Sequence, residues 1–218
     1  MATRSRAAAA EPLAVTTNRL EAFSDGVLAV AITLLVLDIR VPPAGGHSTL
    51  GHELLTEWPR YAAYATSFIT IGIIWINHHA MISRLREVDH SILVLNIFLL
   101  LSVGVLPFAT SLLATYLKAT QGHHLAAAVY SGAYLIRSIV FSLMNRHILF
   151  ARSHLLTAEL ASQVRRKILA RGVTGLVPYA IATALAPLSA YATLAICAAV
   201  AVFYALPVAS GGGVVADE

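Results

Sequence analysis

The sequence predicts an all-α integral membrane protein with six transmembrane helices in each chain. Of its 218 residues, 58% are hydrophobic and only 12% are charged, and the mean hydropathy is +0.74. A soluble domain carries charge on about a quarter of its residues. The charges here form clusters, and the apolar stretches between them reach the roughly 20 residues that cross a bilayer. This pattern excludes a soluble globular domain.

The apolar stretches set the expected helices in order. The first four spans are expected at residues 20–39, 61–82, 92–117 and 125–148. The last apolar block, residues 168–207, is too long for one span. Pro187, in the sequence Ala-Pro-Leu-Ser, predicts a turn that divides this block into a fifth and a sixth helix.

The expected domain is a single six-helix unit between two tails. Residues 19–209 form the transmembrane domain, and residues 1–18 and 210–218 are expected to be disordered cytoplasmic tails. The first tail has basic residues but lacks the continuous apolar segment of a secretory signal.

Lysine and arginine are distributed unevenly between the two sides of the predicted spans, which sets the expected orientation. One side holds only Arg40, Arg60 and Lys118. The other side holds Arg4, Arg6, Arg19, Arg84, Arg86, Arg146, Arg152, Arg165, Arg166, Lys167 and Arg171. We therefore expect a multi-pass protein of the cell membrane with both termini in the cytoplasm. The net charge of +4 fits this bias, and no nucleic-acid partner is expected.

Several ionisable or amide side chains fall inside predicted spans, where each needs a partner or a function. Asp25, His78, His79 and Asn96 are all expected near the cytoplasmic ends of the first three helices, so they can meet at one level. A structural hydrogen-bond network explains such a group better than catalysis does. Trp75 is expected to contribute packing.

The first span has two distinct faces. At about 100° per residue, Val30, Thr33, Leu34 and Leu37 fall within one arc about 100° wide. Asp25 points more than about 100° away from the centre of this arc. The arc is an apolar stripe with one hydroxyl, and spacing alone also allows ordinary helix packing or lipid contact.

Three ordered segments resemble a known family. The first contains Arg19 followed, after three spacers, by Phe23-Ser24-Asp25. The second is Ile-Gly-Ile-Ile-Trp-Ile-Asn-His-His, which ends at His79, and the third combines Asn96 with Leu-Pro-Phe at residues 106–108. These segments resemble the first three helices of the prokaryotic branch of the TMEM175 (DUF1211) potassium channel family.

The resemblance implies a potassium-selective cation channel without a cofactor, in which potassium is the permeant ion among monovalent cations. It implies a homotetramer whose first helix lines a central pore and narrows it with apolar rings, and no carbonyl filter of the TVGYG type occurs in the sequence. By position the narrowest ring is Val30, followed by rings of Thr33, Leu34 and Leu37. The resemblance also implies a structural network around the pore helix that consists of Arg19, Phe23, Ser24, Asp25, Trp75, His78 or His79, and Asn96.

Two other classes remain open from the residues. An intramembrane metal-dependent enzyme would use Asp25 with His78, His79, His123 and His124, but the two histidine pairs belong to opposite ends of their spans. A secondary transporter is often built on broken helices and internal repeats, and neither is visible in the first helix or along the chain. We expect neither enzymatic activity nor a bound metal.

Overall fold

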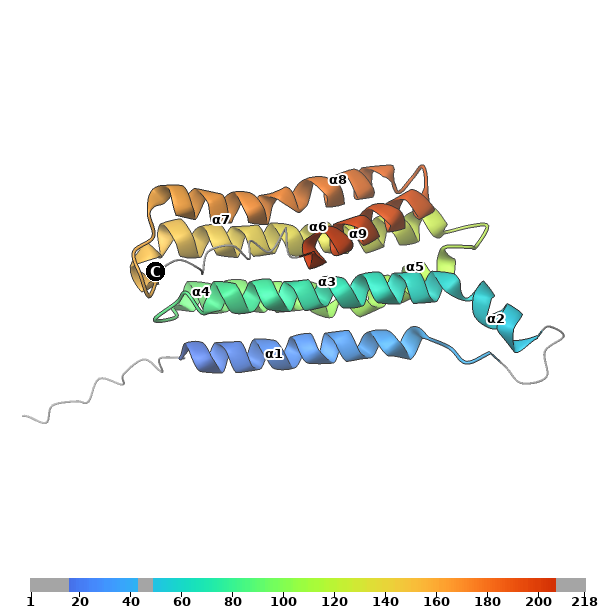
Figure 1. The fold of residues 1–218 in the computed structure, drawn as a ribbon, viewed down its shortest axis with the longest axis horizontal. Helices are drawn as coiled ribbons and strands as arrows, with labels where there is room; N and C mark the ends of the chain where they lie inside the picture. Colours follow the sequence, from blue (N-terminus) through green and yellow to red (C-terminus); the bar gives the residue numbers. More distant parts are fainter. Residues whose placement is uncertain (1–15, 43–48, 207–218) are drawn as a thin grey trace, which may run out of the picture.

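A computed structural model of the chain describes residues 16–42 and 49–206, and within these ranges it is entirely helical apart from the connections and one isolated β-bridge (Figure 1). The all-α class is thereby confirmed. The predicted tails lie outside the described residues except for residues 16–18, which belong to the start of the first helix. In chain order the helices are α1 (Thr17–Leu34), η1 (Leu35–Asp38), α2 (Leu50–Thr56), α3 (Trp58–Ile82), α4 (His90–Gly104), α5 (Leu106–Tyr116), α6 (His123–Arg146), η2 (His147–Ala151), η3 (Ser153–Leu155), α7 (Ser162–Thr174), α8 (Leu176–Leu185) and α9 (Ala190–Ala205).

The long helices run side by side as one bundle, with α1 at its edge (Figure 1). α1 packs against α3 and α4, whereas α6 contacts α4, α5, α7, α8 and α9. α1 changes to a 3-10 helix, η1, for its last turn. This arrangement leaves one side of α1 without a neighbour from the described residues.

Local sequence explains where several helices begin. Thr49 caps α2 by accepting from the backbone N–H of His52. Pro107 occupies the first turn of α5, where its missing N–H costs little, and α4 and α5 are separated only by Val105 within one span. Gly122 precedes α6 with a φ of 83°, and a Cβ there would lie 2.9 Å from the ring of Tyr116.

The last three helices, α7, α8 and α9, correct one predicted boundary and confirm one predicted turn. α7 begins at Ser162, six residues before the predicted start at residue 168, because Arg165, Arg166 and Lys167 continue the helix beyond its apolar part. The predicted turn at Pro187 is confirmed, since α8 ends at Leu185 and α9 starts at Ala190.

Within the described part of the chain, five helical segments are long and apolar enough to cross a membrane: Thr17–Asp38, Trp58–Ile82, His90–Tyr116, His123–Ala151 and Ser162–Leu185. The sixth, α9, is apolar but has only 16 residues. It spans roughly 24 Å at 1.5 Å per residue, which is shorter than the hydrocarbon core. α9 therefore ends partway along the bundle, whereas α3, α6 and α7 extend farther toward one end of it (Figure 1).

The connections 83–89 and 152–161 lie together at one end of the bundle, which we call the basic end because it carries Arg84, Arg86 and Arg152. A short antiparallel bridge between Leu85 and Leu156 joins these connections, with Arg86 N–H donating to the Leu155 carbonyl at 2.8 Å. Asp89 adds a second link. Its carboxylate caps α4 through the Ile92 N–H at 2.8 Å and pairs with the Arg152 guanidinium.

Asp89 should make this end of the bundle acid-sensitive. Partial burial raises the pKa of Asp89, but the hydrogen bonds from Ile92 and Arg152 and the charges of Arg152 and His147 outweigh it, so the pKa lies below its ordinary value of 3.8. A depressed native pKa stabilises the fold above 3.8, and this contribution is lost as pH falls through the native pKa. We expect Asp89→Asn to cost about 0.5 kcal/mol at pH 7, because the pair is partly exposed.

Thermal midpoints of the purified protein between pH 7 and pH 3 measure this effect. The difference between wild type and Asp89→Asn should shrink as the pH falls below 3.8. Asp89→Ala removes the cap as well and should cost about 1 kcal/mol more at neutral pH. A difference that grows on acidification would contradict the assignment.

Candidate functional site

The face of α1 that carries the predicted stripe is uncovered in this chain. Val30 and Leu37 are 57% and 73% exposed, and Thr33 and Leu34 are also exposed. On the opposite face, Leu28 and Leu35 are buried against the rest of the bundle. Hydrophobic side chains at these positions therefore either contact lipid or face copies of the same chain around an axis.

Thr33 is the polar position of the stripe, and its hydroxyl is already oriented. Its Oγ1 donates to the backbone carbonyl of Val30 at 2.9 Å, within its own helix. The hydroxyl proton is thereby used inside the helix, and the oxygen lone pairs are left toward the open side. Thr33 consequently presents an acceptor, which is the polarity that attracts a cation.

A buried chain of hydrogen bonds fixes the other side of α1 to α3 and α4. Nδ2 of Asn96 donates to Oγ of Ser24 at 2.9 Å, and Ser24 donates to the Leu20 carbonyl at 2.8 Å. His78 Nε2 lies 2.8 Å from Oδ1 of Asn96. Ser24, His78 and Asn96 are all at most 1% exposed, so these hydrogen bonds join three helices without contact with solvent.

Asp25 and Glu21 of α1 each pair with a side chain of α3. Asp25 does not bind either histidine; its Oδ1 accepts from the indole Nε1 of Trp75 at 2.9 Å. His79 instead pairs with the carboxylate of Glu21. Glu21 was missed by the sequence reasoning, although a signal exists: Glu21 and Asp25 are four residues apart on α1, as Trp75 and His79 are on α3. Two antiparallel helices bring such pairs together.

Arg19 and Phe23 lie outside this group in the single chain. Both side chains are exposed, Phe23 at 60%, and neither forms a hydrogen bond or ion pair with any described residue. Phe23 lies instead on the uncovered side of α1. The structure thus brings together Ser24, Asp25, Trp75, His78, His79 and Asn96 from the predicted network and leaves these two apart.

The described residues contain no cluster of three or more histidine, cysteine, aspartate or glutamate side chains placed to hold a metal. His123 and His124 have ring centroids 4.0 Å apart, but they lie at the start of α6, at the other end of the bundle from His78 and His79. His124 Nδ1 is engaged with the Ala186 carbonyl at 2.9 Å.

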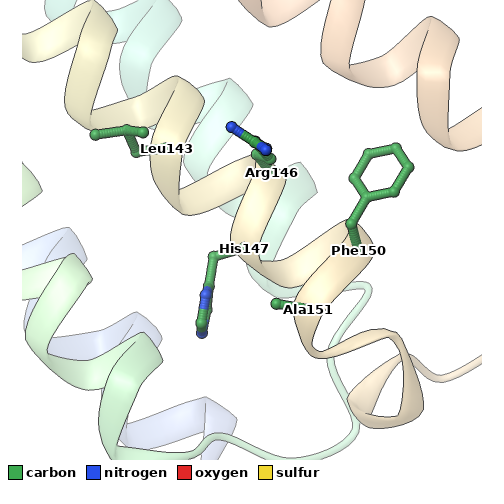
Figure 2. A pocket seen from close by; sticks show the side chains of 5 residues that line it. All are labelled: Leu143, Arg146, His147, Phe150 and Ala151. Carbon is green, nitrogen blue, oxygen red and sulfur yellow. The ribbon is translucent and has the colours of Figure 1, made fainter.

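A small pocket of about 450 Å³ occurs where α6 changes to the π-helical turn η2. Figure 2 shows the imidazole of His147 and the guanidinium of Arg146 pointing away from each other, on different sides of the helix. The remaining lining residues are Leu143, Phe150 and Ala151. These groups do not converge on a common point, so the pocket has no arrangement suited to a polar ligand.

The fold and site together define a multi-pass membrane protein whose first helix is fixed by a buried polar network on one face and left apolar and uncovered on the other. The family model described as endosomal/lysosomal potassium channel TMEM175 matches residues 19–107. A potassium channel of Streptomyces collinus is 41% identical over 187 residues, which cover 86% of this chain and 90% of the relative. The chain belongs to the TMEM175 family.

Solved structures agree with this assignment. The crystal structure of a lysosomal potassium-selective channel TMEM175 homolog from Chamaesiphon minutus matches with a TM-score of 0.76 and 38% identity, covering 87% of this chain and 96% of that one. A structure of a variant of the potassium channel MtTMEM175 matches at 20% identity with a TM-score of 0.60, which supports the fold alone. The family is one of channels and not of enzymes.

Proposed function

We propose that this chain forms a potassium channel of the cell membrane, whose constriction is lined by Val30, Thr33, Leu34 and Leu37 of α1. The observation that carries the proposal is the uncovered apolar stripe with one oriented hydroxyl. The family membership and the names of its closely similar relatives, potassium channels of bacteria, support the same function.

The pore requires more than one copy of the chain. One α1 has a single uncovered face and encloses no channel, so copies have to be arranged around an axis with these faces inward. We propose a homotetramer, as the family resemblance implies. The exposed apolar side chains Ile97, Phe98 and Leu101 of α4 are available for contacts between copies or with lipid.

Selectivity in this proposal arises from partial dehydration. A hydrated ion that enters the constriction loses water at apolar rings that offer no replacement ligand, so the barrier follows the cost of dehydration. Potassium loses water more easily than sodium and passes with the lower barrier. Val30 forms the narrowest ring, and the Thr33 oxygens supply the only polar ligands of the stripe. Apolar rings also close a pore by dewetting, so filter and gate coincide.

The polar network has a positioning function in this mechanism. Ser24 and Asp25 bind Asn96 and Trp75 on the side of α1 away from the stripe, so they hold the pore helix without touching the ion. The predominance of lysine and arginine at the basic end supports the proposed orientation, in which this end and both termini are cytoplasmic.

Ion flux into liposomes that contain the purified protein tests the function. Potassium flux is expected to exceed sodium flux. Thr33→Val keeps the shape of the side chain but removes the oxygen, and it should lower the potassium-to-sodium flux ratio about fivefold, the equivalent of about 1 kcal/mol.

Thr33→Ser keeps the hydroxyl and should retain most of the wild-type ratio, which makes it the matched control. Flux that saturates and depends on a second, coupled ion would favour a secondary transporter. An absence of flux for either ion over a range of pH and voltage would leave the fold intact and overturn the channel assignment.

A further inference from the structure

A large cavity lies on the side of the bundle formed by α3, α6, α7, α8 and α9, and no α1 residue lines it. Its volume is about 770 Å³, which is within the range of cavities that hold small-molecule ligands. α9 covers only part of this region because it ends at Ala205, whereas α3, α6 and α7 continue toward the basic end (Figure 1). The cavity is therefore separate from the proposed pore and is bordered by helix segments that span the membrane.

Three arginines line this cavity without an acidic partner among the described residues: Arg84, Arg137 and Arg171. Arg137 is inside the α6 span, where an unpaired cation is costly. Its guanidinium carbon is 5.7 Å from the centre of the Tyr179 ring, and its Nε is buried without a hydrogen-bond partner in the described structure. Burial also lowers the pKa of Arg84, as expected for a guanidinium that is partly removed from water.

Asn145 is a second unsatisfied group on the cavity wall. The residue is only 5% exposed, and its Oδ1 is buried without a hydrogen-bond partner among the described residues. Native structures rarely leave such groups unpaired unless a ligand or water satisfies them. The amide lies next to α7, because Ser142, three residues before Asn145, donates to the Gly172 carbonyl at 3.3 Å. The polar groups thus gather where α6 and α7 meet.

Apolar side chains make up another part of the lining, which is suited to a hydrocarbon chain. Ile69, Ile73 and Ile76 of α3 and Phe141 of α6 are among the apolar side chains of the cavity. A ligand that satisfies both parts has a negative head and an apolar tail. The lipid bilayer that surrounds the spans supplies molecules with this chemistry.

We propose that this cavity binds an anionic phospholipid, whose phosphate contacts Arg84, Arg137 and Arg171 and whose acyl chain lies along the isoleucines of α3. Arg137 lies nine residues before Arg146, about 13 Å into the helix from that end. Its guanidinium lies against the Tyr179 ring of α8, and the long side chain allows it to turn from there toward a headgroup that enters the cavity. The guanidinium groups bind phosphate through charge-assisted hydrogen bonds. Because the three arginines have no acidic partner among the described residues, they favour a headgroup of net negative charge over a zwitterionic one, whose ammonium group they repel.

Native mass spectrometry of the full-length protein in detergent tests the proposal, with phosphatidylglycerol and phosphatidylcholine added separately. Phosphatidylglycerol should remain bound and phosphatidylcholine should not. Arg137→Gln and Arg171→Gln should each weaken phosphatidylglycerol binding about tenfold through the loss of a charge-assisted hydrogen bond. Arg166→Gln, an exposed position on the same helix as Arg171 that does not line the cavity, should bind as the wild type does.

Three results would overturn the proposal. They are equal retention of both lipids, an equal loss in Arg166→Gln, and competition by inorganic phosphate alone that matches the lipid. The first two would indicate general attraction to a basic surface, and the third a site for a free anion. If Arg137→Gln does not fold, Arg171→Gln still decides the outcome. The readout does not depend on ion conduction, so it stands apart from the channel assignment.

Discussion

Val30→Ser is expected to raise potassium conductance about tenfold, which is about 1.4 kcal/mol of barrier, and to bring the potassium-to-sodium ratio close to one. Serine is smaller than valine, and its hydroxyl offers a ligand to an ion that has lost water. At the proposed narrowest ring both changes lower the dehydration barrier for every monovalent cation, so the difference between potassium and sodium largely disappears. Single-channel recording or liposome flux measures both quantities.

Ala29→Ser supplies the matched control for this variant. Ala29 is also exposed, but on an α-helix it points about 100° away from Val30. The same hydroxyl at that position should leave conductance and selectivity near the wild-type values. If Ala29→Ser changed selectivity as strongly as Val30→Ser, or if Val30→Ser had no effect, the assignment of the stripe to the pore would be wrong.

Asn96→Ala is expected to destabilise the protein by about 3 kcal/mol, because it leaves the buried His78 Nε2 without its partner and removes the bond to Ser24. For a chain of this length that loss lowers the thermal midpoint by roughly 6–12 °C. The midpoint of the purified protein in detergent, followed by size-exclusion chromatography after heating, measures the shift. Ion selectivity of the fraction that remains assembled should be unchanged.

Asn77→Ala separates the buried network from a general effect of removing an amide. Asn77 is exposed, and among the described residues its Nδ2 donates to the Ile73 carbonyl of its own helix at 2.9 Å. The thermal midpoint of Asn77→Ala should fall by no more than about 2 °C, in line with a surface substitution. Similar shifts in both variants, or altered selectivity in Asn96→Ala with normal stability, would contradict a positioning function for the network.

Apolar length predicts the spans well because the bilayer imposes it, and the turn at Pro187 follows from proline chemistry. The start of α7 was placed too late for a physical reason. Hydropathy marks where a helix leaves the hydrocarbon, whereas the helix itself continues through charged residues such as Arg165 to Ser162. The number of residues in α9 was likewise not evident, since the last apolar block continues past Ala205.

The candidate site was likewise predictable only in part from the sequence. Periodicity alone placed Val30, Thr33, Leu34 and Leu37 on one face of α1 and directed Asp25 away from it, because both depend only on helix geometry. It left open whether that face is packed or uncovered. The partners of Asp25 and His79 depend on the relative position of α1 and α3, which a single sequence does not specify. The cavity lined by Arg137 could not be predicted from the sequence either, since it results from α9 ending before its neighbours.

The 3-10 turn at the end of α1 affects how long an ion stays without water in the proposed pore. A 3-10 helix has three residues per turn and rises about 2 Å per residue, so Leu34 and Leu37 lie almost in line along the axis, about 6 Å apart. In a regular α-helix the second leucine would be offset from the first by about 60°, still within the same stripe but not in line with it. In the proposed pore, the rings of Leu34 and Leu37 would therefore form one continuous apolar segment about 6 Å long, roughly the length of two water molecules. On this proposal an ion would cross the segment in a single step, because no hydrated site would lie between the two leucine rings.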